Sequence, residues 1–200
     1  MIFADNIKAI LVEMWPTILL MSVVGFSMRL TYLVKNKEKL ILYKDLMAYF
    51  FIIYILCLFY VVTFHDVSWS TSNFVPFKEI LRYTFGSKMF FKNVLGNMIL
   101  FVPFGFFVSY FLKIDKISII SILTLLTSVT IEETQLIIGR VFDVDDLILN
   151  LIGGIIGFIL YNIVHKLRIS LPNFLKKDYI YNIIMILLIA GLIFYLYIII

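Results

Sequence analysis

Six long runs of apolar residues, separated by short polar links, dominate the pattern of this chain. The runs cover residues 14–34, 46–64, 94–112, 117–138, 147–164 and 179–200. Each run is long enough to cross about 30 Å of hydrocarbon as an α-helix. The pattern therefore predicts an all-α fold, a polytopic transmembrane helical bundle of about six spans.

The composition supports a membrane protein and excludes several other classes. Hydrophobic residues make up 62% of the 200 residues and charged residues only 15%, unlike an ordinary soluble domain. The single cysteine, Cys57, excludes an intramolecular disulfide and a CxxC metal or redox site. A net charge of +4 without basic runs argues against nucleic acid as a partner. No hydrolase, zincin, nucleotide-binding or calcium-loop motif is present, so we expect no cofactor.

Basic residues are distributed unevenly between the two sides of the predicted bundle. Ten of them lie in the first, third and fifth links: Lys35, Lys37, Lys39, Lys44, Lys113, Lys116, Lys166, Arg168, Lys176 and Lys177. The opposite side holds six, four of them in the connection 65–92. Because basic residues favour the cytoplasmic side, both termini are predicted to lie outside. The connection 65–92 and the turn 139–146 then face outward.

The long outer connection has the pattern of a surface helix. Pro76 suits the start of a helix or an extended chain. After it, one helical face is mainly apolar and consists of Phe77, Ile80, Leu81, Thr84 and Phe85. We expect an interfacial amphipathic segment on the outer leaflet, with a loose aromatic loop as the alternative. His65 and Asp66 are expected to mark the outer end of the second run, with a role for His65 as a base as the alternative.

Polar and small residues in three of the runs lie at helical spacing and form seams. In the fourth run one stripe, from which Glu133 points away, contains Ser121, Thr124, Ser128, Glu132 and Gln135. The fifth run has such a face in Asp146, Asn150, Gly153 and Gly157, and the third has a shorter one in Asn93, Gly96 and Asn97. The most polar ends of the seams all point outward, which predicts a common polar pocket near the outer leaflet.

The charged residues near these seams are the candidate functional groups. An ionisable side chain at membrane depth costs several kcal/mol unless it is paired, so we expect Arg140 to pair with Glu132, Asp143 or Asp146. The small and hydroxyl residues are better explained as contacts between helices. Asp145, off the stripe, is expected to be a solvated turn residue. Acids at a helix start are more often caps than cation ligands, so no metal site is expected.

At these residues the chain resembles the VanZ-like family of membrane proteins. Three motifs match in order, and the first two are N-x-x-P-F at residues 73–77 and N-x-x-x-F-x-P-x-G at residues 97–105. The third contains Ile131, Glu132, Gln135, Arg140, Phe142, Asp143, Asp146, Asn150 and Gly153. It departs from the family at 133–134, where apolar residues are usual. The similarity divides the chain into two N-terminal helices and a linker (1–72), a VanZ-like core (73–165) and a C-terminal helix (166–200).

The resemblance implies a multi-pass protein of a bacterial cell membrane. The founding member of the family is associated with low-level resistance to teicoplanin, a lipoglycopeptide that acts outside the membrane. The wider family has been proposed to act on lipid or lipid-linked head groups. The expected partners are therefore membrane lipids or lipid-linked cell-wall precursors, together with a glycopeptide antibiotic.

Three functions stay open at this point. In an enzyme that modifies a lipid head group, the candidate catalytic groups are Glu132, Asp146 and Asp143. The candidate substrate-binding residues are Arg140, Asn97, Gln135, Asn150 and Asn73. The second function is a non-catalytic protein that binds or shields the target of the antibiotic. The third, a transporter, is disfavoured because the sequence has no internal two-fold repeat.

Overall fold

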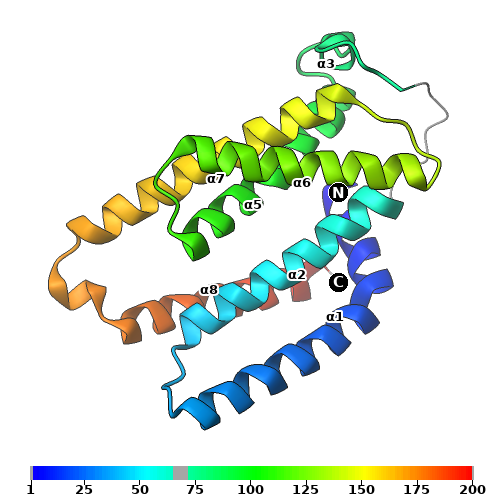
Figure 1. The fold of residues 1–200 in the computed structure, drawn as a ribbon. Helices are drawn as coiled ribbons and strands as arrows, with labels where there is room; N and C mark the ends of the chain where they lie inside the picture. The colour runs from blue at the N-terminus through cyan, green and yellow to red at the C-terminus, as the bar shows by residue number, and fades with distance from the viewer. Residues whose placement is uncertain (1, 65–71, 200) are drawn as a thin grey trace. The chain divides into compact units, whose positions relative to one another are not determined.

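The computed structural model describes residues 2–64 and 72–199, and the regular structure within these ranges is helical. The α-helices are α1 (Ile2–Asn36), α2 (Leu42–Phe64), α3 (Lys78–Arg82), α4 (Lys88–Phe90), α5 (Gly96–Leu112), α6 (Ile117–Ile137), α7 (Val144–Ser170) and α8 (Asp178–Ile199) (Figure 1). A π-helical turn, Phe91–Leu95, precedes α5, and a 3-10 helix, Asn173–Lys176, precedes α8. The predicted all-α fold is confirmed. His65 and Asp66 lie outside the described residues.

Five helical stretches in the described ranges are long and apolar enough to cross a membrane. They are Val12–Asn36 of α1, Leu42–Val61 of α2, Lys88–Leu112 leading through α5, Ile117–Ile137 (α6) and Val144–Ser170 (α7). The sixth predicted span corresponds to α8, whose described apolar part, Asp178–Gly191, is shorter. The chain is therefore a helical transmembrane bundle, as its hydrophobic pattern predicts.

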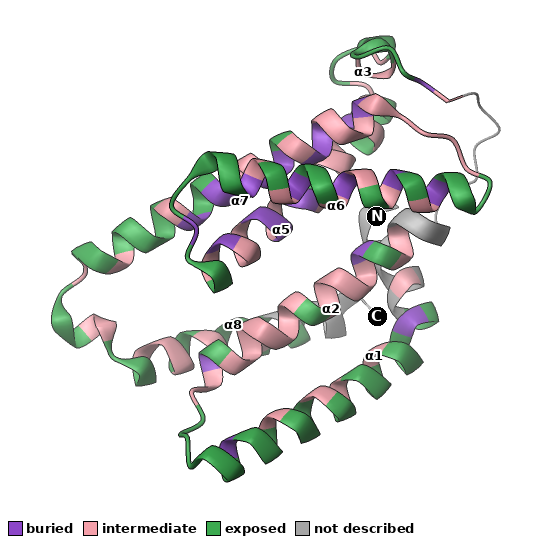
Figure 2. Cartoon of the chain, viewed as in Figure 1, coloured by how far each residue is buried: buried purple, intermediate pink, exposed green. Residues whose placement is uncertain are grey.

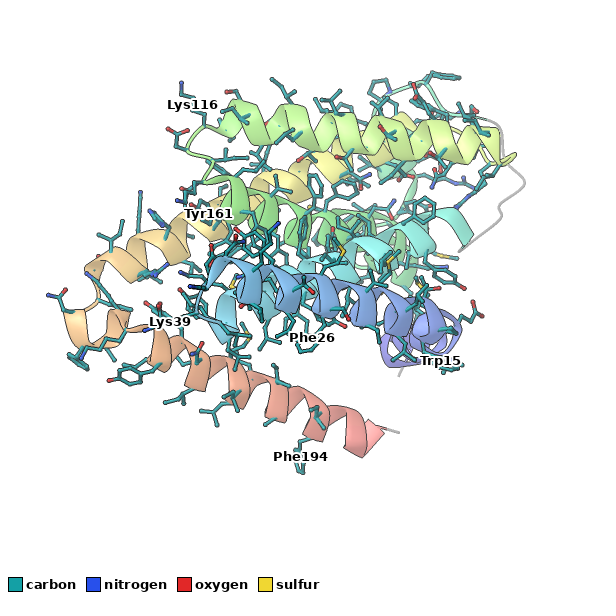
Figure 3. The ribbon with its side chains drawn as sticks, turned by 60° about the horizontal axis from the view of Figure 1, so that its bottom comes forward. Trp15, Phe26, Lys39, Lys116, Tyr161 and Phe194 are labelled. Carbon is teal, nitrogen blue, oxygen red and sulfur yellow. The ribbon has the colours of Figure 1, made fainter. Side chains whose placement is uncertain are left out.

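The chain forms two compact units. The terminal unit combines Met1–Cys57 with Arg168–Ile200, and the central unit is Leu58–Leu167. The last helix is therefore grouped with the first two, although a long stretch of sequence separates them. Many side chains of the terminal unit project outward, as Trp15, Phe26 and Phe194 do in Figure 3. Such exposed apolar side chains are suited to contact with lipid.

Polar contacts hold the terminal unit together at one end. The backbone N–H of Tyr43 on α2 donates to Oδ1 of Asn182 on α8 at 3.0 Å. The guanidinium of Arg168 lies 5.1 Å from the centre of the Tyr181 ring, a cation–π distance. Nε of Arg29 on α1 donates to Oδ1 of Asp45 on α2 at 2.7 Å. These contacts explain why sequence-distant helices form one unit.

Helices α5, α6 and α7 form the core of the central unit. In Figure 2 the buried residues of α5, α6 and α7 recur along each helix, alternating with less buried ones. Phe101 on α5, Ile120 on α6 and Phe158 on α7 are among the buried apolar side chains. Each of the three helices also carries a predicted polar seam, so the core is the place where the seams meet.

Glycines let the backbones of α5 and α7 touch. A Cβ added at Gly153 would collide with the carbonyl of Met98, and one at Gly157 would collide with the carbonyl of Val102. Small residues at such a crossing increase the van der Waals contact between membrane helices. The small face predicted on the fifth run is therefore the surface that packs against α5.

The connection predicted to face outward is, over its described residues, less helical than its pattern predicts. Helix α3 has only five residues, and Tyr83 directly after it is extended. Thr84 and Phe85 consequently lie beyond the helix, and the apolar face predicted through Phe85 is interrupted. The segment still presents apolar side chains on its surface, since Leu81 is 80% exposed and Phe85 is 88% exposed.

Candidate functional site

The turn between α6 and α7 carries two of the candidate residues, Arg140 and Asp143, and a glycine shapes its start. Gly139 has a φ of 84°, a left-handed conformation that side chains disfavour. Its N–H donates to the carbonyl of Leu136 at 3.1 Å, and the N–H of Arg140 donates to the carbonyl of Gln135 at 2.8 Å. This pair of bonds is a Schellman motif. It ends α6 and places Arg140 directly after the glycine.

Asp143 caps the start of α7. Its Oδ1 accepts the backbone N–H of Asp145 at 2.9 Å, as expected for a short acid directly before a helix. The same oxygen accepts Nδ2 of Asn73 at 2.9 Å. Burial raises the pKa of the Asp143 carboxyl, although these two bonds act in the opposite direction. Asp143 therefore combines a structural role with an altered acidity.

Asn73 fastens the segment before α3 to this turn. Its backbone N–H donates to the carbonyl of Phe142 at 2.8 Å, and its carbonyl accepts the N–H of Val144 at 3.0 Å. These bonds form an isolated parallel bridge between Asn73 and Asp143. The side-chain oxygen of Asn73 accepts the N–H of Val75 at 3.1 Å. Nδ2 and Oδ1 of the buried Asn73 side chain thus both form hydrogen bonds within the protein.

Asp145 departs furthest from the expectation based on sequence. It is not a solvated turn residue, because it is only 1% exposed. Its carboxylate accepts the backbone N–H groups of Phe77, Glu79 and Ile80, the last two at 2.7 and 3.1 Å. Such groups at a helix start have no partner within the helix, and an acid is favoured beside them. Asp145, a residue of α7, therefore caps α3.

Glu132 connects α6 to the same turn. Its side chain is buried, and Oε2 accepts the backbone N–H of Asp143 at 3.0 Å. A buried carboxylate is costly unless it receives hydrogen bonds, and this contact supplies one. The seam predicted on the fourth run is confirmed from Thr124 through Ser128 to Gln135, which are buried with Glu132, while Glu133 is exposed. Ser121, at the other end of the predicted stripe, is only partly buried.

Two amide contacts join the seams of the three helices. Nδ2 of Asn97 on α5 donates to Oδ1 of Asp146 on α7. Nδ2 of Asn150 on α7 donates to Oγ of Ser128 on α6 at 2.8 Å. The three seams therefore come together through these two pairs of polar groups, and the common pocket predicted there stays a prediction.

Arg140 supplies positive charge to this end of the bundle. Its side chain is half-buried, and its charge acts on the carboxylates of Glu132 and Asp146. Opposite charges in a medium of low dielectric interact more strongly than in water. Arg140 is therefore placed to act on these acids, and its expected pairing with one of them stays a prediction.

We call Glu132, Asp143, Asp145 and Asp146 the carboxylate cluster. Asp143 and Asp145 accept backbone N–H groups and organise the turn. Glu132 and Asp146 come from two different spans, and groups of this kind are able to accept hydrogen bonds from a ligand or to transfer a proton. Within residues 2–64 and 72–199, no group of three or more His, Cys, Asp or Glu side chains is arranged to hold a metal ion.

Comparison with known proteins gives one match. The VanZ/LLP1 family model matches residues 51–165, more than half of the chain and including the whole carboxylate cluster. This match confirms the resemblance inferred from the three motifs. No curated protein and no solved structure matches the chain.

Proposed function

Since the chain belongs to the VanZ/LLP1 family, we propose that this multi-pass membrane protein recognises a lipid or lipid-linked head group at the carboxylate cluster. Arg140, Glu132 and Asp146 are the proposed contact residues. The amide side chains of the three packed helices are proposed to help bind the head group; they are those of Asn97, Gln135 and Asn150. We give Asn73 and Asp143 a positioning role, because their side chains bond to each other and to the backbone.

One observation carries this proposal: Arg140 of the turn and two acids from different spans, Glu132 and Asp146, lie at one end of a three-helix core. Charges at such a position are costly, so they indicate a functional site. A phosphorylated head group complements both signs. Its phosphate suits the planar guanidinium of Arg140. Its hydroxyl or ammonium groups suit the carboxylates of Glu132 and Asp146.

We further propose that the cluster faces the outside of a bacterial cell, with both chain termini on the same side. The support is the excess of basic residues in the links on the opposite side. In this orientation the cluster lies on the side of the membrane where cell-wall lipid precursors and a glycopeptide antibiotic meet it. It would then lie in the leaflet where teicoplanin acts.

Catalysis and simple binding make different demands on Glu132 and Asp146. General acid or base catalysis requires a group that gains and loses a proton, which an amide cannot do. Hydrogen bonding to a head group requires only an oxygen of similar shape. Glu132→Gln and Asp146→Asn therefore separate an enzyme from a protein that binds or shields its ligand.

The direct test is lipid retention by the purified full-length protein. Native mass spectrometry of the protein taken from membranes should detect bound phospholipid or lipid-linked precursor. Arg140→Ala should reduce the retained lipid by about tenfold, a loss typical of one charge-assisted contact. Lys116→Ala, which removes an exposed charge before α6, is the matched control and should retain lipid as the native chain does.

Cellular assays then separate the possible consequences of binding. In a strain lacking the protein, lipid and cell-wall precursor profiles should change if the protein is an enzyme, and Glu132→Gln should fail to restore them. If the protein shields its target, teicoplanin sensitivity should rise without a change in those profiles. Undiminished lipid retention by Arg140→Ala would contradict the proposed site.

A further inference from the structure

The segment that leads into the third span carries apolar side chains that are exposed among the described residues of the central unit. We call residues 74–85 the arm. Its exposed apolar side chains are Phe74, Val75, Phe77, Leu81 and Phe85. An apolar surface of this kind on a membrane protein needs a partner that removes it from water.

The arm is fastened to the protein largely through backbone groups and one carboxylate. Asp145 accepts three N–H groups of the arm, from Phe77, Glu79 and Ile80. The N–H of Asp145 in turn donates to Asp143, whose own N–H donates to Glu132. A continuous series of hydrogen bonds thus runs from the arm to α6.

We propose that the arm inserts its apolar side chains into the adjoining membrane leaflet and that Asp145 is the positioning residue that holds it there. The inference depends on the membrane location of the chain and not on the proposed recognition of a head group. Asp145 serves the arm through backbone contacts, so the exposed faces of the apolar side chains are left to meet lipid, although Phe74 stacks on Phe142 and Phe85 contacts Phe90.

Two features identify the lipid leaflet as the occupant. The arm is continuous with a membrane span, because Lys88–Leu112 begins three residues after Phe85. The apolar side chains also alternate with the exposed basic residues Lys78 and Arg82. A segment with apolar and basic side chains of this kind lies in the interface, where phosphates meet the basic groups and acyl chains meet the apolar ones.

Spin labelling of the full-length protein tests this inference. A nitroxide is attached at Leu81→Cys after Cys57→Ser removes the native thiol, and the protein is placed in phosphatidylethanolamine and phosphatidylglycerol vesicles. Collisions with oxygen report a lipid environment, and collisions with a water-soluble nickel chelate report water. We expect oxygen collisions to dominate. Asp145→Ala should increase both the mobility of the label and its collisions with nickel severalfold.

Two controls separate release of the arm from loss of the fold. A label at Ile137→Cys, an exposed site at the end of α6, should keep its mobility when Asp145 is replaced. Asp115→Ala, which removes an exposed acid from the link between α5 and α6, should leave the label at Leu81→Cys unchanged. If Asp145→Ala does not accumulate, Asp145→Asn retains one acceptor oxygen and should release the arm partially.

Three results would overturn the inference. Dominant nickel collisions at position 81 with Asp145 intact would place the arm in water. Weak collisions with both reagents would show that protein covers it, either a second copy or another chain. Unchanged mobility in both Asp145 variants would show that this carboxylate does not hold the arm. Lipid retention by the Asp145 variants would report on the head-group proposal separately.

Discussion

Oε2 of Glu132 accepts the backbone N–H of Asp143 at 3.0 Å, so the side chain of one membrane helix holds the turn that begins the next. The contact ties the two ends of the turn together across the residues that contain Arg140. Any ligand of Arg140 or Asp146 therefore meets a turn whose backbone is already positioned.

Substitutions of Glu132 should separate this structural bond from any chemical role. Glu132→Gln keeps an oxygen that can accept the N–H of Asp143, so the free energy of unfolding should change little. Glu132→Leu leaves that N–H without its partner and should lower the free energy of unfolding by about 1–3 kcal/mol. Thermal unfolding in detergent measures both. Equal stability of the two variants would show that the bond contributes little.

The acidity of Asp143 should make stability depend on pH. Because burial raises the pKa of this carboxyl in the folded protein, folding favours its protonated form. The stability that this carboxyl contributes is fully present below its pKa in the unfolded chain, about 3.9. It is lost as the pH rises through the higher pKa of the folded protein. Asp143→Asn should remove this loss and still accept the N–H of Asp145.

Unfolding temperatures of the native chain and of Asp143→Asn, measured at a series of pH values, test the sign of this effect. The native chain should lose stability relative to the variant as the pH rises through that window. A native chain that gained stability relative to the variant over the same range would show that the hydrogen bonds to Asp143 outweigh its burial.

Close packing of α5 and α7 should make one glycine intolerant of even a methyl group. A Cβ at Gly157 would meet the backbone of Val102 and Phe106, which flexible side-chain motion cannot relieve. Gly157→Ala should therefore destabilise the protein by about 1–3 kcal/mol. Gly25→Ala on α1 is the matched control, because nothing lies within 4 Å of its added Cβ. Similar unfolding temperatures for both variants would contradict the packing.

The proposed sidedness predicts which positions react from outside the cell. In a chain with Cys57→Ser, Val141→Cys in the turn between α6 and α7 should react with an impermeant thiol reagent added to intact cells. Asn36→Cys, at the C-terminal end of α1, should react only after the cells are opened. Labelling of Asn36→Cys alone in intact cells would invert the orientation and place the cluster on the cytoplasmic side.

The sequence by itself determined the helices and the residues that face the core. Successive residues of a helix are rotated by about 100°, so polar groups spaced by three and four must share a face. This rule alone predicts that Ser128, Glu132 and Gln135 are buried together, and they are. The hydrophobic runs likewise predict the bounds of α6 within a residue, because length and apolar composition decide membrane spans.

Only the tertiary structure decided which groups bond across the chain. Asn73 and Asp143 are 70 residues apart, and no local pattern relates them. Asp145 lies off the stripe of α7, so the sequence predicts a solvated residue. In the structure α3 begins after Phe77, whose side chain cannot accept hydrogen bonds from the first N–H groups of that helix. The lack of a capping side chain at Phe77 was the signal in the sequence that another residue caps α3. Which acid satisfies it depends on how distant segments pack, because a hydrogen bond needs proximity in space and not in sequence.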